Sequence, residues 1–123
     1  MQISIGTDIV SISRFREFAR DRSHPALRKI FTPAELDYCF SKDDVEVHLA
    51  ARFAGKEAII KALNSRNIDT VWYTDIEITN NEKGVPSVMI KKEISGSPEL
   101  KISLAHCEDK AIAYALITGD DYQ

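Results

Sequence analysis

Cysteine is scarce in this chain, and so are the segments that would direct a protein into or across a membrane. Only two cysteines, Cys39 and Cys107, occur among 123 residues, and their spacing matches neither a disulfide framework nor a zinc site. No apolar run approaches the roughly 20 residues that a membrane-spanning helix needs. The first residues also lack the basic and apolar regions of a signal peptide. We therefore expect a cytoplasmic protein with reduced cysteines and no membrane partner.

Glycine is scarce as well, with five residues in the chain. No glycine-rich phosphate loop follows an expected strand, which disfavours a doubly wound nucleotide-binding fold. The sequence also lacks internal repeats and low-complexity segments. What is present is 44% hydrophobic and 28% charged residues, a composition typical of globular proteins. We expect a single domain over residues 1–123, long enough to bury a core.

Positive charge is concentrated in one segment, although the formal net charge of the chain is −3. Six basic residues lie between positions 14 and 29 against only Glu17 and Asp21, a local balance of +4: Arg14, Arg16, Arg20, Arg22, Arg28 and Lys29. A basic surface on an acidic protein predicts one acidic partner rather than general affinity for nucleic acid. A solvated helix face with ion pairs four residues apart is the alternative.

Hydrophobic periodicity separates a helical first half from a strand-rich second half. A strand over residues 3–12 comes first, and helices are expected over 13–21, over 25–31, after the capping-box pattern Thr32–Glu35, and from Asp43 or Asp44 to about Leu63. Four strand-like segments follow, over 72–80, 85–94, 100–106 and 110–118. This order predicts an α+β fold: an N-terminal strand, three to four helices, and an antiparallel meander packed against the long helix.

Asp8 is an unusual residue for its place in the first strand, which is otherwise built from Ile, Val, Ser and Thr. A carboxylate in such a place costs free energy unless something compensates it. If Asp8 serves a neighbouring turn or pairs with an arginine, its role is structural. A divalent cation would make it functional, because Mg²⁺ prefers carboxylate oxygens and keeps several waters.

Glu57 and Lys61 raise a similar choice in the segment RFAGKEAIIKAL. They are four residues apart in a predicted helix, so they share one face and could form an ordinary surface ion pair. Phe53 on the same face indicates that this stripe is not plainly exposed. Gly55 costs on the order of 1 kcal/mol inside a helix, and a close approach of backbone or ligand would explain it.

His106 ends a predicted strand, and the residues alone favour a satisfied structural histidine, since no His/Cys cluster indicates zinc. Its neighbour Cys107 points to the opposite strand face, so a Cys–His pair is not expected. Together, however, two acidic residues, two lysines and Arg52 suit a Mg²⁺-dependent reaction at a phosphate ester.

The motifs IGTDIV, RFAGKEAIIKAL, KGVP and ISLAH resemble those of holo-acyl-carrier-protein synthase, the small type of phosphopantetheinyl transferase. Their order and separations match over nearly the whole chain. The resemblance implies an enzyme of fatty acid biosynthesis that transfers the 4′-phosphopantetheine arm of coenzyme A to a serine of acyl carrier protein, depends on Mg²⁺ and releases 3′,5′-ADP. It also implies a homotrimer with active sites between subunits, and the acidic carrier protein would dock on the basic segment 14–29.

The resemblance implies a role for each matching residue. Asp8 and Glu57 would bind Mg²⁺, and Glu57, directly or through a metal-bound water, is the best candidate for the base that takes the serine proton. Lys61 would act in catalysis at the phosphates. The expected coenzyme A contacts are Arg52, Lys56, Lys61, Gly84, Pro86 and His106. Two departures from the family pattern affect these contacts: Ala105 replaces a serine beside His106, and Val85 replaces a lysine between Gly84 and Pro86.

Two other classes of function stay open at this point. A Mg²⁺-dependent nuclease usually needs Glu-x-Lys on one strand, whereas Glu57 and Lys61 have helical spacing. A non-catalytic module that binds a carrier protein would need only residues 14–29, and the presence of both Asp8 and Glu57 argues against it.

Overall fold

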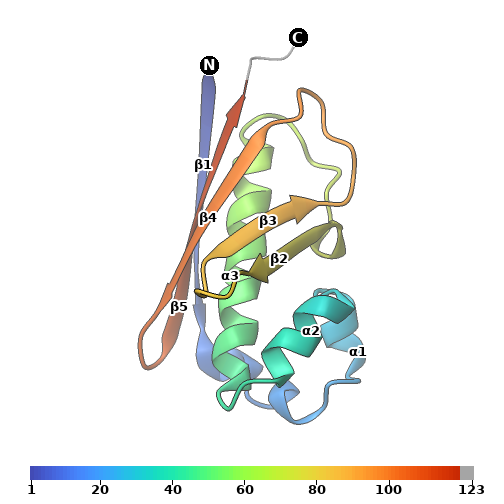
Figure 1. Ribbon diagram of the computed structural model, residues 1–123, viewed down its shortest axis with the longest axis vertical. Coiled ribbons are helices and arrows are strands. Elements are labelled where there is room, and N and C mark those ends of the chain that lie inside the picture. The colour runs from blue at the N-terminus through green and yellow to red at the C-terminus, as the bar shows by residue number, and fades with distance from the viewer. Residues whose placement is uncertain (120–123) are drawn as a thin grey trace.

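One long helix organises the computed structural model, which describes residues 1–119. Helix α3, Val45–Asn64, begins after Asp44 as predicted and buries most of its residues. Figure 1 shows it (green) lying along a sheet of long strands, with a shorter hairpin and two small helices on its other side. Within residues 1–119 no helix is both long enough and apolar enough to cross a membrane.

Two antiparallel sheets replace the continuous meander that the sequence predicts. The first has the strand order β1-β5-β4 and the second pairs β2 with β3. Between β3 and β4 the backbone turns sharply at Gly96 and Ser97, which both have positive φ, and this redirects the chain from one sheet to the other. The α+β class and the packing on α3 are confirmed. The strands are β1 (Gln2–Ser11), β2 (Ile76–Asn80), β3 (Pro86–Ile90), β4 (Glu99–His106) and β5 (Lys110–Gly119).

The small helices follow local signals only in part. Helix α1 (Pro25–Arg28) and helix α2 (Pro33–Phe40) both begin at proline, and the predicted capping box between Thr32 and Glu35 is present at α2. The helix expected over 13–21 is wrong. Two 3-10 turns, Ile12–Phe15 and Phe18–Arg20, occupy this segment, because tertiary packing buries Phe15 against the rings of Phe31 and Phe53.

Glycine permits β1 and α3 to touch backbone to backbone. A Cβ at Gly6 would lie 2.0 Å from the carbonyl oxygen of Ala58, and a Cβ at Gly55 would lie 2.8 Å from side-chain carbons of Ile78 and Ile102. The close approach expected at Gly55 is therefore one of packed side chains. The contact at Gly6 brings the strand that carries Asp8 directly against the helix that carries Lys61.

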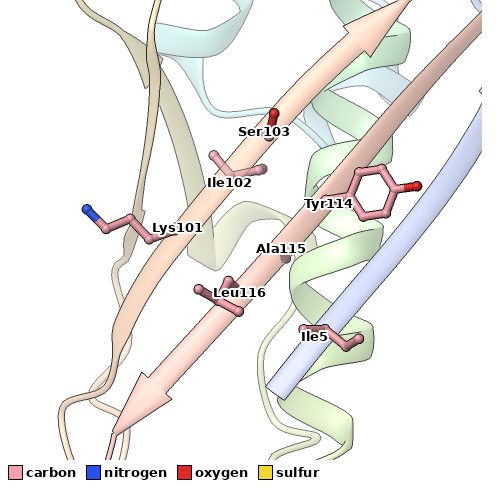
Figure 2. Close-up of a pocket in the computed structure, with 7 residues that line it drawn as sticks. All are labelled: Ile5, Lys101, Ile102, Ser103, Tyr114, Ala115 and Leu116. Atoms are coloured by element: carbon pink, nitrogen blue, oxygen red, sulfur yellow. The ribbon is translucent and has the colours of Figure 1, made fainter. Parts of the chain in front are cut away.

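The outer face of the three-stranded sheet is apolar and uncovered in the single chain. The isoleucines that alternate along β1 point outward, and Ile5 is 72% exposed. Ile5 lies opposite Leu116 of β5, and Thr7 lies opposite Tyr114. Figure 2 shows Ile5, Tyr114 and Leu116 near Ile102 of β4, where they line a shallow groove of about 330 Å³. An exposed apolar patch of this kind marks an interaction surface.

Candidate functional site

Asp8 and Lys61 meet where β1 crosses α3. The Lys61 ammonium lies 3.1 Å from Asp8 Oδ1 and also donates to the carbonyl oxygen of Thr7 at 3.0 Å. The side chain of Asp8 is 18% exposed and that of Lys61 is 53% exposed. The carboxylate that Lys61 contacts is thus Asp8 of β1, and not the helical neighbour Glu57 that the spacing of four residues suggested. An exposed pair of this kind is free to rearrange around an incoming anion.

Glu57 is held by a residue that the sequence did not single out. The hydroxyl of Tyr73 donates a hydrogen bond to Glu57 Oε1. Burial raises the pKa of Tyr73 to about 12, and the hydrogen bond to Glu57 and the charges of Glu57 and Asp8 add to that rise. Tyr73 thus contacts Glu57 directly, and the charge of Asp8 acts on its pKa without a contact. Asp8, Glu57, Lys61 and Tyr73 form one cluster at the junction of β1, α3 and the turn before β2, which we call the carboxylate cluster.

The carboxylate cluster is consistent with a magnesium site of a particular type. Among residues 1–119 no three His, Cys, Asp or Glu side chains converge as a ready-made metal site. Mg²⁺ is usually held by one or two carboxylates together with waters and substrate phosphates, and not by a cage of protein ligands. Asp8 and Glu57 supply the carboxylate donors that this arrangement requires, beside an exposed lysine.

Lys56 does not belong to this cluster, and its predicted contact with coenzyme A is corrected by the structure. Its ammonium is fully buried and lies 2.6 Å from Glu35 Oε1. It also donates to the carbonyl oxygens of Ile30, Tyr73 and Ile76 at 2.7–2.9 Å. An ammonium has three donors, so none is left for a phosphate. Lys56 instead connects α3 to Glu35 of α2, to Ile30 just before α2, and to Tyr73 and Ile76 where the second sheet begins.

Arg52 is also buried, but hydrogen bonds connect it to Gly84, one of the predicted coenzyme A contacts. Its guanidinium lies over the ring of Tyr38, 4.0 Å from the centroid, and donates to the side chain of Asn80. The amide of Asn80 in turn donates to the carbonyl oxygen of Gly84 at 3.0 Å. Gly84 has φ +81° in the turn between β2 and β3, a conformation that favours glycine. Arg52 and Gly84 thus belong to one network.

The remaining predicted residues lie apart from the carboxylate cluster within one chain. Pro86 begins β3. His106 is exposed at the end of β4, and β5 separates that strand from β1 and Asp8. The structure therefore brings Asp8, Glu57 and Lys61 together. It leaves Gly84, Pro86 and His106 on other edges of the molecule.

The basic segment borders the cluster through an open groove of about 550 Å³. Arg14 lies over the ring of Phe53, 5.0 Å from the centroid. Tyr73 contributes to the same groove, so the groove reaches the residue that binds Glu57. Its lining combines cationic or titratable side chains with aromatic ones: Arg14, His24, Lys29, Phe53, Trp72 and Tyr73.

Tyr73 is the member of the carboxylate cluster that the sequence did not indicate. The segment WYTD was assigned to a strand, whereas residues Tyr73–Asp75 form a 3-10 turn. The available signal was Asp75, which caps this turn by accepting from the backbone N–H of Trp72 at 2.8 Å. A capped turn directly before a strand would have placed the tyrosine at the edge of the fold, and not within a sheet.

Comparison with known families now identifies the class of protein. The family model described as ACPS, 4′-phosphopantetheinyl transferase superfamily, matches residues 4–115, so the chain belongs to this superfamily. Within it, the resemblance to holo-acyl-carrier-protein synthases is confirmed. The chain is 36% identical over 119 residues to the holo-[acyl-carrier-protein] synthase of Protochlamydia amoebophila (strain UWE25), covering 94% of this chain and 98% of that protein.

Two further comparisons agree with this membership. The holo-[acyl-carrier-protein] synthase of Chlamydia pneumoniae is 39% identical over 117 residues, covering 93% of this chain and 95% of that protein. Among solved structures, an ACPS–CoA complex from Chronobacterium ammoniagenes superposes with a TM-score of 0.82 at 27% identity and covers 98% of this chain and 99% of that one.

Proposed function

We propose that this chain is a holo-acyl-carrier-protein synthase, a transferase that moves the 4′-phosphopantetheine arm of coenzyme A to a serine of apo acyl carrier protein. The reaction releases 3′,5′-ADP and supplies fatty acid biosynthesis with its active carrier. Residues 1–123 act as one transferase domain in the cytoplasm. Beyond family membership, the convergence of Asp8, Glu57 and Lys61 carries this proposal.

Asp8 and Glu57 are the proposed Mg²⁺ ligands. Asp8 contacts Lys61, which lies one helical turn from Glu57 on α3. Two carboxylates match the preference of Mg²⁺ for few protein ligands completed by phosphates and water. When bound, the ion supplies charge stabilisation for the pyrophosphate and its leaving group. Removal of either carboxylate would weaken binding of the ion, and the negative charge of the pyrophosphate would then lack this stabilisation.

Lys61 and Glu57 are the proposed catalytic residues. The Lys61 ammonium is exposed enough to leave Asp8 and stabilise charge on a phosphate oxygen. Glu57 takes the proton of the carrier serine, directly or through one water. The serine oxygen then forms a bond to the phosphorus that carries pantetheine, and the bond from that phosphorus to the oxygen of 3′,5′-ADP breaks.

Coenzyme A is proposed to extend from the carboxylate cluster toward the turn at Gly84 and Pro86. Arg52 supports this turn through Asn80. Because His106 lies two strands away from Asp8 in one chain, it would contribute to the site of an adjacent subunit. Val85 and Ala105 replace polar residues in these motifs, so we expect fewer side-chain contacts to coenzyme A at both positions.

A homotrimer is proposed to form on the outer face of the three-stranded sheet. Ile5, Tyr114 and Leu116 are exposed there, and they lie on two neighbouring strands that present one continuous apolar surface (Figure 2). Burial of such a surface favours symmetric assembly. Light scattering should therefore give a trimer mass at micromolar concentration, and Leu116→Glu should shift it to the monomer.

The acidic carrier protein is proposed to dock on the basic segment 14–29 and the groove beside it. Arg14 offers a cation over an aromatic ring at the groove, whereas Arg22 is already paired with Asp37. Tyr73 lines the groove and binds Glu57, so a carrier bound there would present its serine near Glu57. Charged groups at such a rim steer the encounter and set its salt dependence.

One assay tests the proposed function directly. The protein is incubated with coenzyme A, Mg²⁺ and apo acyl carrier protein, and the carrier is weighed by mass spectrometry. A mass increase of one phosphopantetheine, lost on addition of a chelator, is expected. An unchanged carrier mass would contradict the proposal. A carrier that binds without changing mass would indicate a non-catalytic module, and cleavage of added DNA or RNA would indicate a nuclease.

A further inference from the structure

Several contacts hold the Tyr73 ring in place for its hydrogen bond to Glu57, which is more than an incidental surface contact would have. The ring of Tyr73 contacts two other aromatic rings, with its centroid 5.6 Å from that of Phe53 and 4.7 Å from that of Trp72. The indole of Trp72 is itself fixed by donating to the carbonyl oxygen of Lys29 at 3.2 Å. The ring of Tyr73 therefore has little freedom to turn its hydroxyl away from Glu57.

The backbone at Tyr73 is fixed just as firmly. Its carbonyl oxygen accepts from the buried Lys56 ammonium at 2.8 Å, and Asp75 closes the 3-10 turn that holds it. Lys56 and Glu57 are adjacent on α3, so the helix holds Tyr73 at two points: Lys56 binds its backbone and Glu57 binds its hydroxyl. A closed loop of contacts of this kind leaves the carboxylate few alternative orientations.

A single donor on one oxygen has a defined effect on a carboxylate. Tyr73 occupies Oε1 of Glu57 and leaves Oε2 for another partner. A neighbouring donor that fixes a ligand in this way commonly changes metal affinity or activity by about 10- to 100-fold. Tyr73 also lines the groove through which the carrier serine would arrive, so its hydrogen bond links Glu57 to that groove.

We infer that Tyr73 is a positioning residue, which holds the Glu57 carboxylate in the orientation needed for metal binding and proton transfer. The inference rests on the proposed function, because Glu57 is a ligand and base only if the chain is a phosphopantetheinyl transferase. Tyr73 itself touches neither phosphate nor serine in this account. The residue acts through one hydroxyl, so Tyr73→Phe removes its role and keeps the ring and the aromatic packing.

The test compares wild type and Tyr73→Phe in two measurements. In the first, Mn²⁺ replaces Mg²⁺ and its binding to the coenzyme A complex is followed by electron paramagnetic resonance without carrier protein, so that no transfer occurs. We expect the Mn²⁺ dissociation constant to rise about tenfold or more in Tyr73→Phe. In the second, steady-state transfer should show a fall of similar size in kcat, with the carrier-protein KM changed less than about twofold.

Tyr38→Phe is the matched control, since it removes the same atom from a tyrosine of α2 that lies outside the carboxylate cluster. It should match wild type in both measurements, and all three proteins should have similar melting temperatures. Equal Mn²⁺ dissociation constants in wild type and Tyr73→Phe overturn the inference, as does an absence of Mn²⁺ binding to wild type. A change confined to the carrier-protein KM also overturns it, because Tyr73 would then serve only docking.

The proposed function fails separately. If wild type transfers nothing to a carrier protein, the function is wrong whatever Tyr73 does. If wild type transfers normally and Tyr73→Phe behaves like it, the function stands and only the positioning role is lost.

Discussion

Helix α3 carries two lysines five residues apart, and each forms an ion pair with a carboxylate. One pair is buried and the other is exposed to solvent. Lys56 and Glu35 are 2.6 Å apart and their side chains are 0% exposed. Lys61 and Asp8 are 3.1 Å apart and are 53% and 18% exposed. The chemistry is the same in both pairs. Solvent and the number of additional partners make the difference.

The buried pair is stable only because every donor and acceptor around it is satisfied. Three carbonyl oxygens complete the coordination of Lys56, and Glu35 accepts from the backbone N–H groups of Thr32 and Ile78. Burial lowers the pKa of Lys56 below its ordinary value, and the charge of Glu35 opposes that shift. A pair with so many partners cannot exchange them. The exposed pair can, and a site for a phosphate substrate requires that freedom.

Breaking the buried pair should have the largest effect on folding. Lys56→Met leaves Glu35 as an uncompensated buried charge, and loss of one partner of such a pair costs about 3–5 kcal/mol. Urea unfolding should show this loss in the free energy of unfolding. Lys61→Met, the matched control on the same helix, should change it by less than about 1 kcal/mol. Similar losses in both variants would remove the distinction between the pairs.

Asp8→Asn should have the next largest effect, on activity and not on folding. Loss of a charged group that binds the metal and orients it commonly costs about 3–4 kcal/mol of transition-state stabilisation, or roughly 100- to 1000-fold in kcat. Transfer should fall by this amount in the mass assay, and Glu57→Gln should behave alike. The urea midpoint should stay near that of wild type. A variant of Asp8 that unfolds but retains turnover would assign this residue to the structure.

Lys61→Ala should lower activity less than Asp8→Asn does, and it tests whether the exposed pair differs in role from the buried one. A charged hydrogen bond to a phosphate is worth about 1.5–3 kcal/mol, so kcat/KM for coenzyme A should fall roughly 10- to 100-fold. The exposed ion pair contributes at most about 1 kcal/mol to folding, and the melting temperature should move little. If unfolding accounts for the whole loss, Lys61 is a structural residue like Lys56.

Arg14→Glu should give the smallest effect and tests a cation outside both pairs. Reversal of a rim charge slows the encounter with an acidic partner and flattens its salt dependence. The carrier-protein KM should rise several-fold while the coenzyme A KM stays nearly constant, as measured by initial rates at two salt concentrations. Equal shifts in both constants, or none, would place carrier docking elsewhere.

Features that depend on neighbouring residues could be predicted from the sequence. The capping box at Thr32 and Glu35 and the start of α3 after Asp44 follow from short patterns, and family motifs pointed to Asp8, Glu57 and Lys61. Features that depend on distant contacts could not. The same Glu35 that caps α2 also neutralises Lys56 twenty-one positions later, and no spacing rule links them.

The position of Tyr73 shows the same limit. Its hydroxyl reaches Glu57 from a turn sixteen residues further along the chain, and it arrives there because Lys56 holds the backbone of that turn. The strand pairing shows this limit too, since β5 pairs with the first strand of the chain as well as with β4. A hydrophobic pattern specifies that a strand forms but not which strand lies beside it.

The contact of Gly6 with Ala58 fixes the distance between strand and helix at this site, whereas the orientation of Glu57 can be changed. The backbone contact at Gly6 sets how closely β1 approaches α3, so the separation between the backbones of Asp8 and Lys61 is fixed, while their side chains stay free to rearrange. The orientation of Glu57 depends instead on a single tyrosine hydroxyl. An engineer who wishes to change the preferred metal should therefore vary position 73 and leave position 6 untouched, because a larger residue at 6 would force strand and helix apart.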